Sequence, residues 1–162
     1  MIVISNTSPI INLAAVGRLD LLRQLYGQIV IPQAVYIEIV GIGAGQPGAD
    51  EVAASDWIQT RQVANRTAVT ALQLELDDGE AEAIALAVEA SPDLLLLDEA
   101  LGRAIASRFG LRFIGLLGCL VEAKKMGLVS AVQPIVDDLI EKAGFWIGRP
   151  LYERVLQAAG ER

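Results

Sequence analysis

Residues 77–99, which read DDGEAEAIALAVEASPDLLLLDE, decide the fold class of this chain. The acidic start and the alanine-rich run predict a helix, and the four leucines at 94–97 predict a short strand after a Ser-Pro turn. A strand without polar alternation is buried on both faces, as in the parallel sheets of α/β proteins. We therefore expect a helix that leads into a central strand of a parallel sheet.

Two carboxylates bracket this unit. Glu80 lies at the predicted helix start, and Asp98 directly follows the predicted strand. A helix that feeds a parallel strand begins at the edge where that strand ends, and chemistry in such sheets gathers at this edge. Local explanations remain open for both residues. Asp77 and Glu80 fit a capping box, and Asp98 can cap the following helix.

The rest of the chain continues the α/β pattern. Buried strands are predicted at 1–5 and 29–31, an alternating strand at 57–63, a short strand at 112–114 and an edge strand at 146–147, and no clear pattern covers 64–76. Amphipathic helices are predicted between the strands, including one from 32 to 40 that carries Glu38. Because no linker interrupts the pattern, we expect one three-layer α/β/α domain over 1–162, with a central, mainly parallel sheet.

Composition narrows the possible functions. The hydrophobic share of 53% suits a sheet covered on both faces, and part of it also suits a subunit interface. The net charge of −7 argues against nonspecific adhesion to nucleic acid but allows an RNA substrate at a site that collects cations. The chain has no histidine, which excludes His-bound zinc and Ser-His-Asp catalysis, and its one cysteine excludes an internal disulfide. Without a basic leader or an apolar run of about 20 residues, we expect a cytoplasmic protein with no membrane span.

Four oxygen-bearing side chains are expected near one edge of the sheet. Asn6 ends the first predicted strand, and Glu38, Glu80 and Asp98 come from the elements described above. Hard divalent cations such as Mg²⁺ and Mn²⁺ prefer oxygen ligands and keep several waters, so a few carboxylates on rigid elements are sufficient. The sequence therefore predicts a site for one of these ions, where a bound phosphodiester would be polarised for hydrolysis.

Several motifs, in this order, resemble a known family. They are ISNTSPII at 4–11, GRLDLL at 17–22, IPQAVYIE at 31–38, GEAEAIALA at 79–87, LLLD at 95–98 and GLLG at 115–118. Together they resemble the PIN-domain ribonucleases, and in particular a PIN-like family of uncharacterised prokaryotic proteins related to the ribonucleases of toxin–antitoxin pairs. The resemblance covers nearly the whole chain.

The resemblance implies a PIN-like (Rossmann-like) fold and a metal-dependent endoribonuclease that uses Mg²⁺ or Mn²⁺. It implies catalytic roles for Glu38, Glu80 and Asp98, which together with Asn6 would hold the metal. The supporting residues would be Thr7, Ser8, Glu82 and Glu99, with Arg103 directing RNA phosphates. Single-stranded or structured RNA would be the substrate, and an antitoxin and a second copy of the chain would be the protein partners.

Asn6 departs from the family pattern, which typically has Asp at this position. An amide oxygen can bind a cation but contributes no charge. An alternative function is therefore a PIN-fold module that binds protein or RNA with weakened or absent catalysis. A nucleotide-binding or phosphate-transferring domain is disfavoured, because the chain has no Walker loop and Asn6 denies the first strand a nucleophilic Asp.

Overall fold

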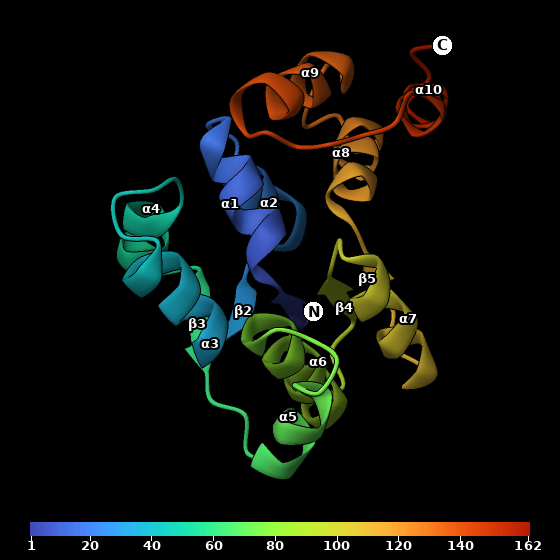
Figure 1. Ribbon diagram of the computed structural model, residues 1–162. Coiled ribbons are helices and arrows are strands. Elements are labelled where there is room, and N and C mark those ends of the chain that lie inside the picture. The colour runs from blue at the N-terminus through green and yellow to red at the C-terminus, as the bar shows by residue number, and fades with distance from the viewer.

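A computed structural model describes residues 1–162 and contains one central sheet of five parallel strands (Figure 1). The strands are β1 (Val3–Ser5), β2 (Ile29–Pro32), β3 (Ile58–Arg61), β4 (Leu94–Leu96) and β5 (Phe113–Ile114). Their order across the sheet is β3-β2-β1-β4-β5, so β1 and β4 are neighbours at its centre. Ser5 pairs with Leu96, which brings the carboxyl ends of these two strands together.

Helices connect and cover the strands. The α-helices are α1 (Thr7–Ala15), α2 (Asp20–Tyr26), α3 (Gln33–Tyr36), α4 (Ala49–Ala54), α5 (Arg66–Leu72), α6 (Asp78–Ala90), α7 (Ala100–Arg108), α8 (Leu116–Lys125), α9 (Gln133–Lys142) and α10 (Arg149–Ala158), and a π-helix, η1 (Ile37–Ile42), follows α3. None of them is long and apolar enough to cross a lipid bilayer.

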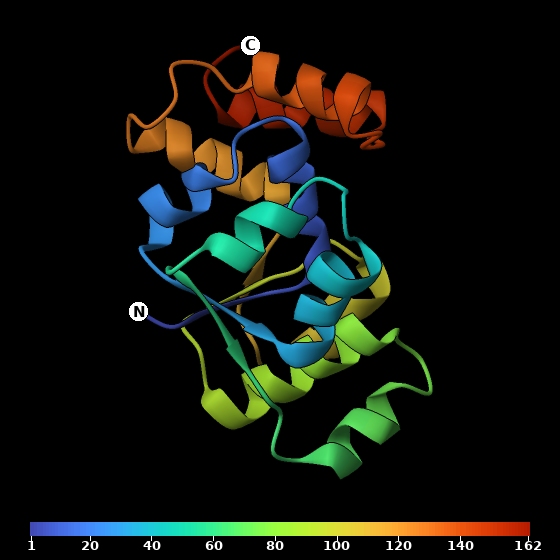
Figure 2. The ribbon, with the colours of Figure 1, turned by 90° about the vertical axis from the view of Figure 1, so that its left-hand side faces the viewer.

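The sheet separates two hydrophobic cores. Successive residues of a strand point to opposite faces, so Val3 packs into one core and Ile4 into the other. The larger core lies under α1, α2, α8, α9 and α10, and the smaller one lies under α5, α6 and α7. Figure 2 shows these two helical layers above and below the strands. The three-layer, mainly parallel α/β/α fold predicted from the sequence is therefore confirmed.

Three segments differ from the sequence prediction. The unassigned region contains α5, which Asn65 caps by accepting a hydrogen bond from the backbone N–H of Ala68 at 3.1 Å. Residues 146–147 form no strand and belong to the loop between α9 and α10. In this loop the Phe145 N–H donates to the Leu139 carbonyl at 3.0 Å, which turns the chain back toward α9 instead of along a sheet edge.

The predicted helix at 32–40 changes its winding at Glu38. It begins as α3 and continues as η1, where the Gly43 N–H donates to the Glu38 carbonyl five residues earlier at 2.9 Å. Gly43 permits this wide turn, because a methyl group added there would lie 2.7 Å from the Ile39 carbonyl oxygen. Such π-helical turns are frequent at functional sites. Here the turn includes Glu38, one of the predicted metal ligands.

Candidate metal centre

The carboxyl ends of β1 and β4 form the base of the candidate site. Asn6 and Asp98 leave these neighbouring strands at the same edge, and the Asn6 N–H donates to the Leu96 carbonyl at 3.0 Å. Parallel pairing therefore brings together two residues that are 92 positions apart in the chain, 98 − 6. This is the edge at which parallel α/β sheets usually bind ligands.

Asn6, Thr7 and Glu38 form the first half of the site, which we call the β1 half. The Thr7 hydroxyl donates to Glu38 Oε2 at 2.7 Å, and both side chains face the start of α6. A methyl group added at Gly79 would lie 2.8 Å from Glu38 Oε2 and 3.4 Å from Asn6 Oδ1. Because position 79 is glycine, these oxygens can approach the helix start closely.

The Asn6 side chain has an unused acceptor. Asn6 stands at the N-cap position of α1, yet its side chain accepts no hydrogen bond from the helix. The residue is only 4% exposed, and its Oδ1 atom has no donor. A buried oxygen without a partner costs free energy unless a donor or a cation satisfies it. Asn6 Oδ1 is therefore suited to a cation.

Glu80 is buried in the first turn of α6. Asp77 caps this helix by accepting the Glu80 N–H at 2.8 Å. The Glu80 side chain also reaches toward α7, where a methyl group added at Gly102 would lie 3.0 Å from its Oε2 atom. Burial, then a side-chain hydrogen bond with Asp77, and then the charges of Asp77 and Glu99 raise the pKa of Glu80 to about 7, while a hydrogen bond with the Asp77 backbone opposes that rise.

Asp98 belongs to the second half of the site, which we call the β4 half and which also includes Glu99 and Arg103. Asp98 Oδ1 accepts the Leu116 N–H at 2.8 Å, whereas Oδ2 is buried without a donor. Asp98 therefore bonds to the start of α8 and not to α7, the next helix. Burial raises the pKa of Asp98, while the Leu116 N–H and the Arg103 charge oppose that rise.

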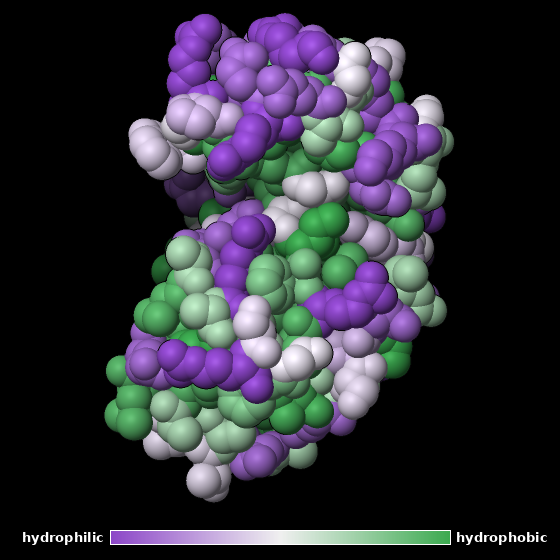
Figure 3. All heavy atoms as spheres, turned by 90° about the vertical axis from the view of Figure 1, so that its right-hand side faces the viewer, coloured by the Kyte–Doolittle hydropathy of each residue, from purple (hydrophilic) through white to green (hydrophobic).

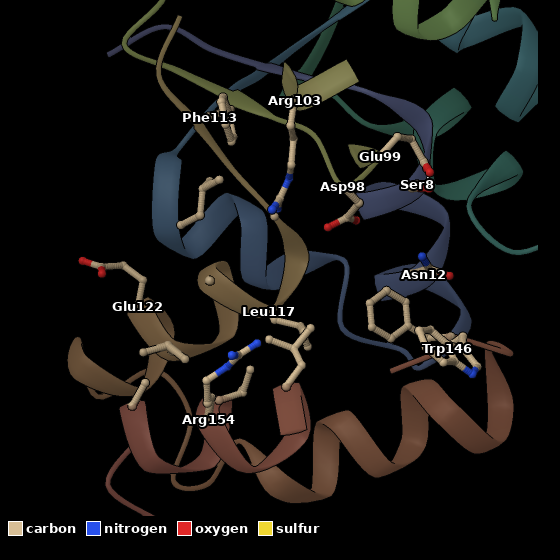
Figure 4. Close-up of a pocket in the computed structure, with 18 of the residues that line it drawn as sticks. Ser8, Asn12, Asp98, Glu99, Arg103, Phe113, Leu117, Glu122, Trp146 and Arg154 are labelled. Carbon is tan, nitrogen blue, oxygen red and sulfur yellow. Dashed lines mark hydrogen bonds between the residues drawn. The ribbon is translucent and has the colours of Figure 1, made fainter. Parts of the chain in front are cut away.

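Arg103 reaches from α7 to Asp98, and Figure 4 shows both side chains pointing into one hollow. Its Nε atom donates to the Leu97 carbonyl at 2.8 Å, and its guanidinium lies 5.5 Å from the centre of the Phe113 ring. A methyl group added at Gly115 would overlap Arg103 Nη2 and lie 2.7 Å from Asp98 Oδ1. The glycine therefore leaves room for the Asp98 carboxylate and the Arg103 guanidinium.

The remaining predicted supporting residues differ in their surroundings. The Ser8 hydroxyl donates to Glu99 Oε1 at 3.1 Å, which links α1 to the β4 half. Both oxygens of Glu82 are in use, because one accepts the Ala34 N–H at 2.9 Å and the other pairs with Arg66 at 3.0 Å. Glu82 therefore holds the start of α3 in place. Of the two acids Glu80 and Glu82, Glu80 is the one that reaches α7.

The predicted acidic ligands do not form a compact set around one point. No group of three or more carboxylates is close enough together to hold a metal ion. Two of the three buried side-chain atoms without a partner, Asn6 Oδ1 and Asp98 Oδ2, nevertheless follow adjacent strands at one sheet edge, and the third is Ser55 Oγ. Asn6 Oδ1 lies near Glu38 Oε2 at the start of α6, while Glu38 and Asp98 line two different cavities. This donor set fits Mg²⁺ or Mn²⁺, which take oxygen ligands and complete their coordination with water.

A family model described as a PIN domain matches residues 2–161. The chain belongs to the PIN-domain family. Membership indicates a nuclease-like fold, and the five-stranded parallel sheet of this PIN domain agrees with it. No curated protein matched the chain.

Sequence reasoning missed part of the surroundings of this PIN-domain site. A cavity of about 880 Å³ continues from Asp98 and Glu99, and Asn12, Trp146 and Arg154 also line it. A tryptophan between Gly144 and Gly148 was the available signal, since glycines on both sides are more typical of a loop than of an edge strand. Asn12 and Arg154 gave no comparable signal, because each lies on an ordinary amphipathic helix.

Proposed function

We propose that this PIN domain is a metal-dependent endoribonuclease. The observation that supports it best is the pair of buried oxygens without donors, Asn6 Oδ1 and Asp98 Oδ2, at the ends of adjacent strands. Burying two acceptors without donors costs free energy, and a divalent cation would satisfy both. The family match adds a nuclease-like fold to this argument.

In this proposal Glu38, Glu80, Asp98 and Asn6 hold Mg²⁺ or Mn²⁺. When bound, the ion would polarise a phosphoryl oxygen and lower the pKa of a water. Thr7 keeps the Glu38 carboxylate in place through its 2.7 Å hydrogen bond, and the Leu116 N–H does the same for Asp98. Arg103, beside Asp98, would bind an RNA phosphate.

The proposal extends to the cellular setting. RNA is the substrate, the chain works in the cytoplasm as a single PIN domain that forms homodimers, and an antitoxin protein would restrain it as a toxin. The RNA substrate, the antitoxin and the homodimer derive from the family resemblance, while the location and the single domain derive from the sequence pattern. The acidic character of the chain is compatible with them, because a cation at the site would offset local negative charge toward RNA.

The test is RNA cleavage by the purified chain with Mn²⁺ and with a chelator. We expect cleavage only with the metal, and a loss of about 100-fold or more in Asp98→Asn, because metal-assisted charge stabilisation contributes several kcal/mol. The substitution keeps an oxygen for the Leu116 N–H. Asp56→Asn removes an exposed acid away from the site and should leave cleavage unchanged.

A second candidate function is a PIN-fold module that binds RNA or protein without cleaving. The neutral Asn6 favours it, since one ligand position carries no charge. Absence of Mn²⁺-dependent cleavage in the parent chain, together with its appearance in Asn6→Asp, would select this function over the nuclease. Equal cleavage by the parent and Asp98→Asn would reject the nuclease site.

A further inference from the structure

The groove beside the candidate metal centre carries an inference about the substrate. One wall comes from α8, α10 and the loop at 143–148, and the other comes from the β4 half. Figure 3 shows the surface hollowed between the upper part of the molecule, with α8 to α10, and the lower part. Because Asp98 and Glu99 line the groove, a chain bound at the metal centre would continue into it.

Trp146 is the most unusual residue in this groove. Its side chain is 86% exposed, although the 143–148 loop that carries it is fixed by the bond from Phe145 to Leu139. A methyl group added at Gly148 would lie 3.7 Å from the indole Cη2 atom, so the edge of the ring lies near Gly148. A supported indole that is largely open to solvent is a platform for a flat ligand.

Three basic side chains, Arg103, Lys125 and Arg154, line the same groove together with the acids Asp98, Glu99 and Glu122. Arg103 lies beside Asp98, whereas Lys125 and Arg154 form no ion pair with a carboxylate of the chain. The wall made by α8 and α10 therefore offers two cations, Lys125 and Arg154, to an anionic ligand. Figure 4 shows the Arg103 and Arg154 side chains reaching into the groove from opposite walls, with Trp146 farther along the groove, near Asn12.

We propose that this groove binds an unpaired stretch of RNA, with one nucleobase stacked on Trp146 and phosphates near Arg154 and Lys125. The inference rests on the proposed function in one respect, which is that the RNA continues from the metal centre. The stacked base must be unpaired, because the faces of bases in a duplex are already stacked and cannot cover the indole. An apolar peptide would explain the open indole but leave Lys125 and Arg154 without partners.

The experiment measures Trp146 fluorescence without relying on catalysis. The chain has two tryptophans, so Trp57→Phe leaves Trp146 as the only indole, and Asp98→Asn with a chelator prevents cleavage. A short single-stranded RNA should quench the fluorescence at the concentration at which it binds. A duplex of the same sequence should not quench it.

Substitutions at position 146, read out by fluorescence anisotropy of a labelled RNA, separate stacking from apolar contact. Trp146→Leu should weaken single-strand binding by roughly 5- to 100-fold, the usual range for one stacked base, while Trp146→Phe should retain most of it. Phe109→Ala removes another exposed aromatic side chain, which does not line the groove, and should leave binding unchanged. Because Trp146 is so exposed, these variants should keep the fold.

Several outcomes would overturn the inference. These are quenching by the duplex as strong as by the single strand, single-strand binding without quenching, full binding by Trp146→Leu, or no RNA binding at all. The outcomes for the proposed nuclease function are separate from these. Mn²⁺-dependent cleavage without quenching would reject only the stacking site, and quenching without cleavage would reject only the nuclease.

Discussion

The β1 half and the β4 half of the candidate metal centre share one feature and differ in another. Each contains one buried oxygen without a donor, Asn6 Oδ1 in the first and Asp98 Oδ2 in the second. The β1 oxygen is a neutral amide, whereas the β4 oxygen belongs to a carboxylate with Arg103 beside it. The comparison shows that the β4 half holds two carboxylates and an arginine, whereas the β1 half holds one carboxylate and a neutral amide. Under the proposed function, phosphate binding would belong to the β4 half.

Two glycines allow each half to be disturbed by one methyl group. Gly115→Ala should displace Arg103 and Asp98 and lower Mn²⁺-dependent cleavage by about 100-fold, the cost of a misplacement of about 1 Å. Gly79→Ala should only turn Glu38 aside and lower cleavage by about 10-fold, a smaller loss of the same kind. Neither glycine has a positive φ, so alanine is compatible with both backbones.

Gly41→Ala is the matched control for the two glycine variants. A methyl group there would meet only an Ile37 side-chain carbon at 3.8 Å, which is an ordinary contact. Cleavage rates measured under single-turnover conditions, beside thermal melts of each variant, separate misplacement from unfolding. Equal losses in Gly79→Ala and Gly115→Ala would show that the two halves contribute alike.

Asn6→Asp should make the two halves electrostatically similar. We expect about tenfold tighter Mn²⁺ binding, because one added charge contributes on the order of 1 kcal/mol at a partly solvated site. The metal-free variant should melt at a lower temperature than the parent, since the new carboxylate is buried without a donor. Melting curves recorded against Mn²⁺ concentration report both effects.

Asn65→Asp is the control for this substitution, because it introduces the same charge at the cap of α5, where Asn65 lies beside Glu89 near the C-terminal end of α6. It should leave the Mn²⁺ response unchanged. An unchanged Mn²⁺ midpoint in Asn6→Asp would mean that position 6 does not contact the ion.

Glu80 should make the metal-free protein lose stability as pH rises. Its pKa of about 7 lies above the ordinary value of 4.5, so the folded protein holds a proton that the unfolded chain releases first. The resulting stabilisation is complete below about pH 4.5 and is lost as pH rises through about 7. Urea unfolding in a chelator across this range should show the decline.

Glu80→Gln should flatten that part of the pH profile. Glu75→Gln, which removes an exposed acid before α6, should retain it. Mn²⁺ should also reduce the decline in the parent chain, since the cation would replace the proton as the partner of the carboxylate. A decline that persists in Glu80→Gln would assign the titration to another group.

The hydroxyls beside Asn6 should give the smallest effects. Thr7→Val removes the part-buried 2.7 Å bond to Glu38 and should weaken Mn²⁺ binding by about 5-fold, the equivalent of about 1 kcal/mol. Ser8→Ala removes an exposed 3.1 Å bond to Glu99 and should change Mn²⁺ binding by less than about 2-fold. Isothermal titration with Mn²⁺ measures both effects. A larger effect from Ser8→Ala than from Thr7→Val would contradict this prediction.

The sequence was sufficient for the architecture because its signals are local. The leucines at 94–97 and the run at 29–31 are buried on both faces, and that pattern alone predicts a covered parallel sheet. Asp77 was predicted as a helix cap, and it caps α6. The predicted edge strand at 146–147 was wrong. The hydrogen bond from Phe145 to Leu139 turns this loop, and no local sequence pattern predicts that bond.

By itself the sequence determined which oxygen-bearing residues stand at the ends of buried strands and helix starts, since hydrophobic runs and caps fix those positions along the chain. Only the tertiary structure decided where their side chains point. Asp98 bonds to Leu116, Glu80 reaches the start of α7, and Trp146 stands open in a groove shared with Asp98. The physical reason is that side-chain direction and unsatisfied acceptors depend on packing between distant segments, which neither periodicity nor composition records.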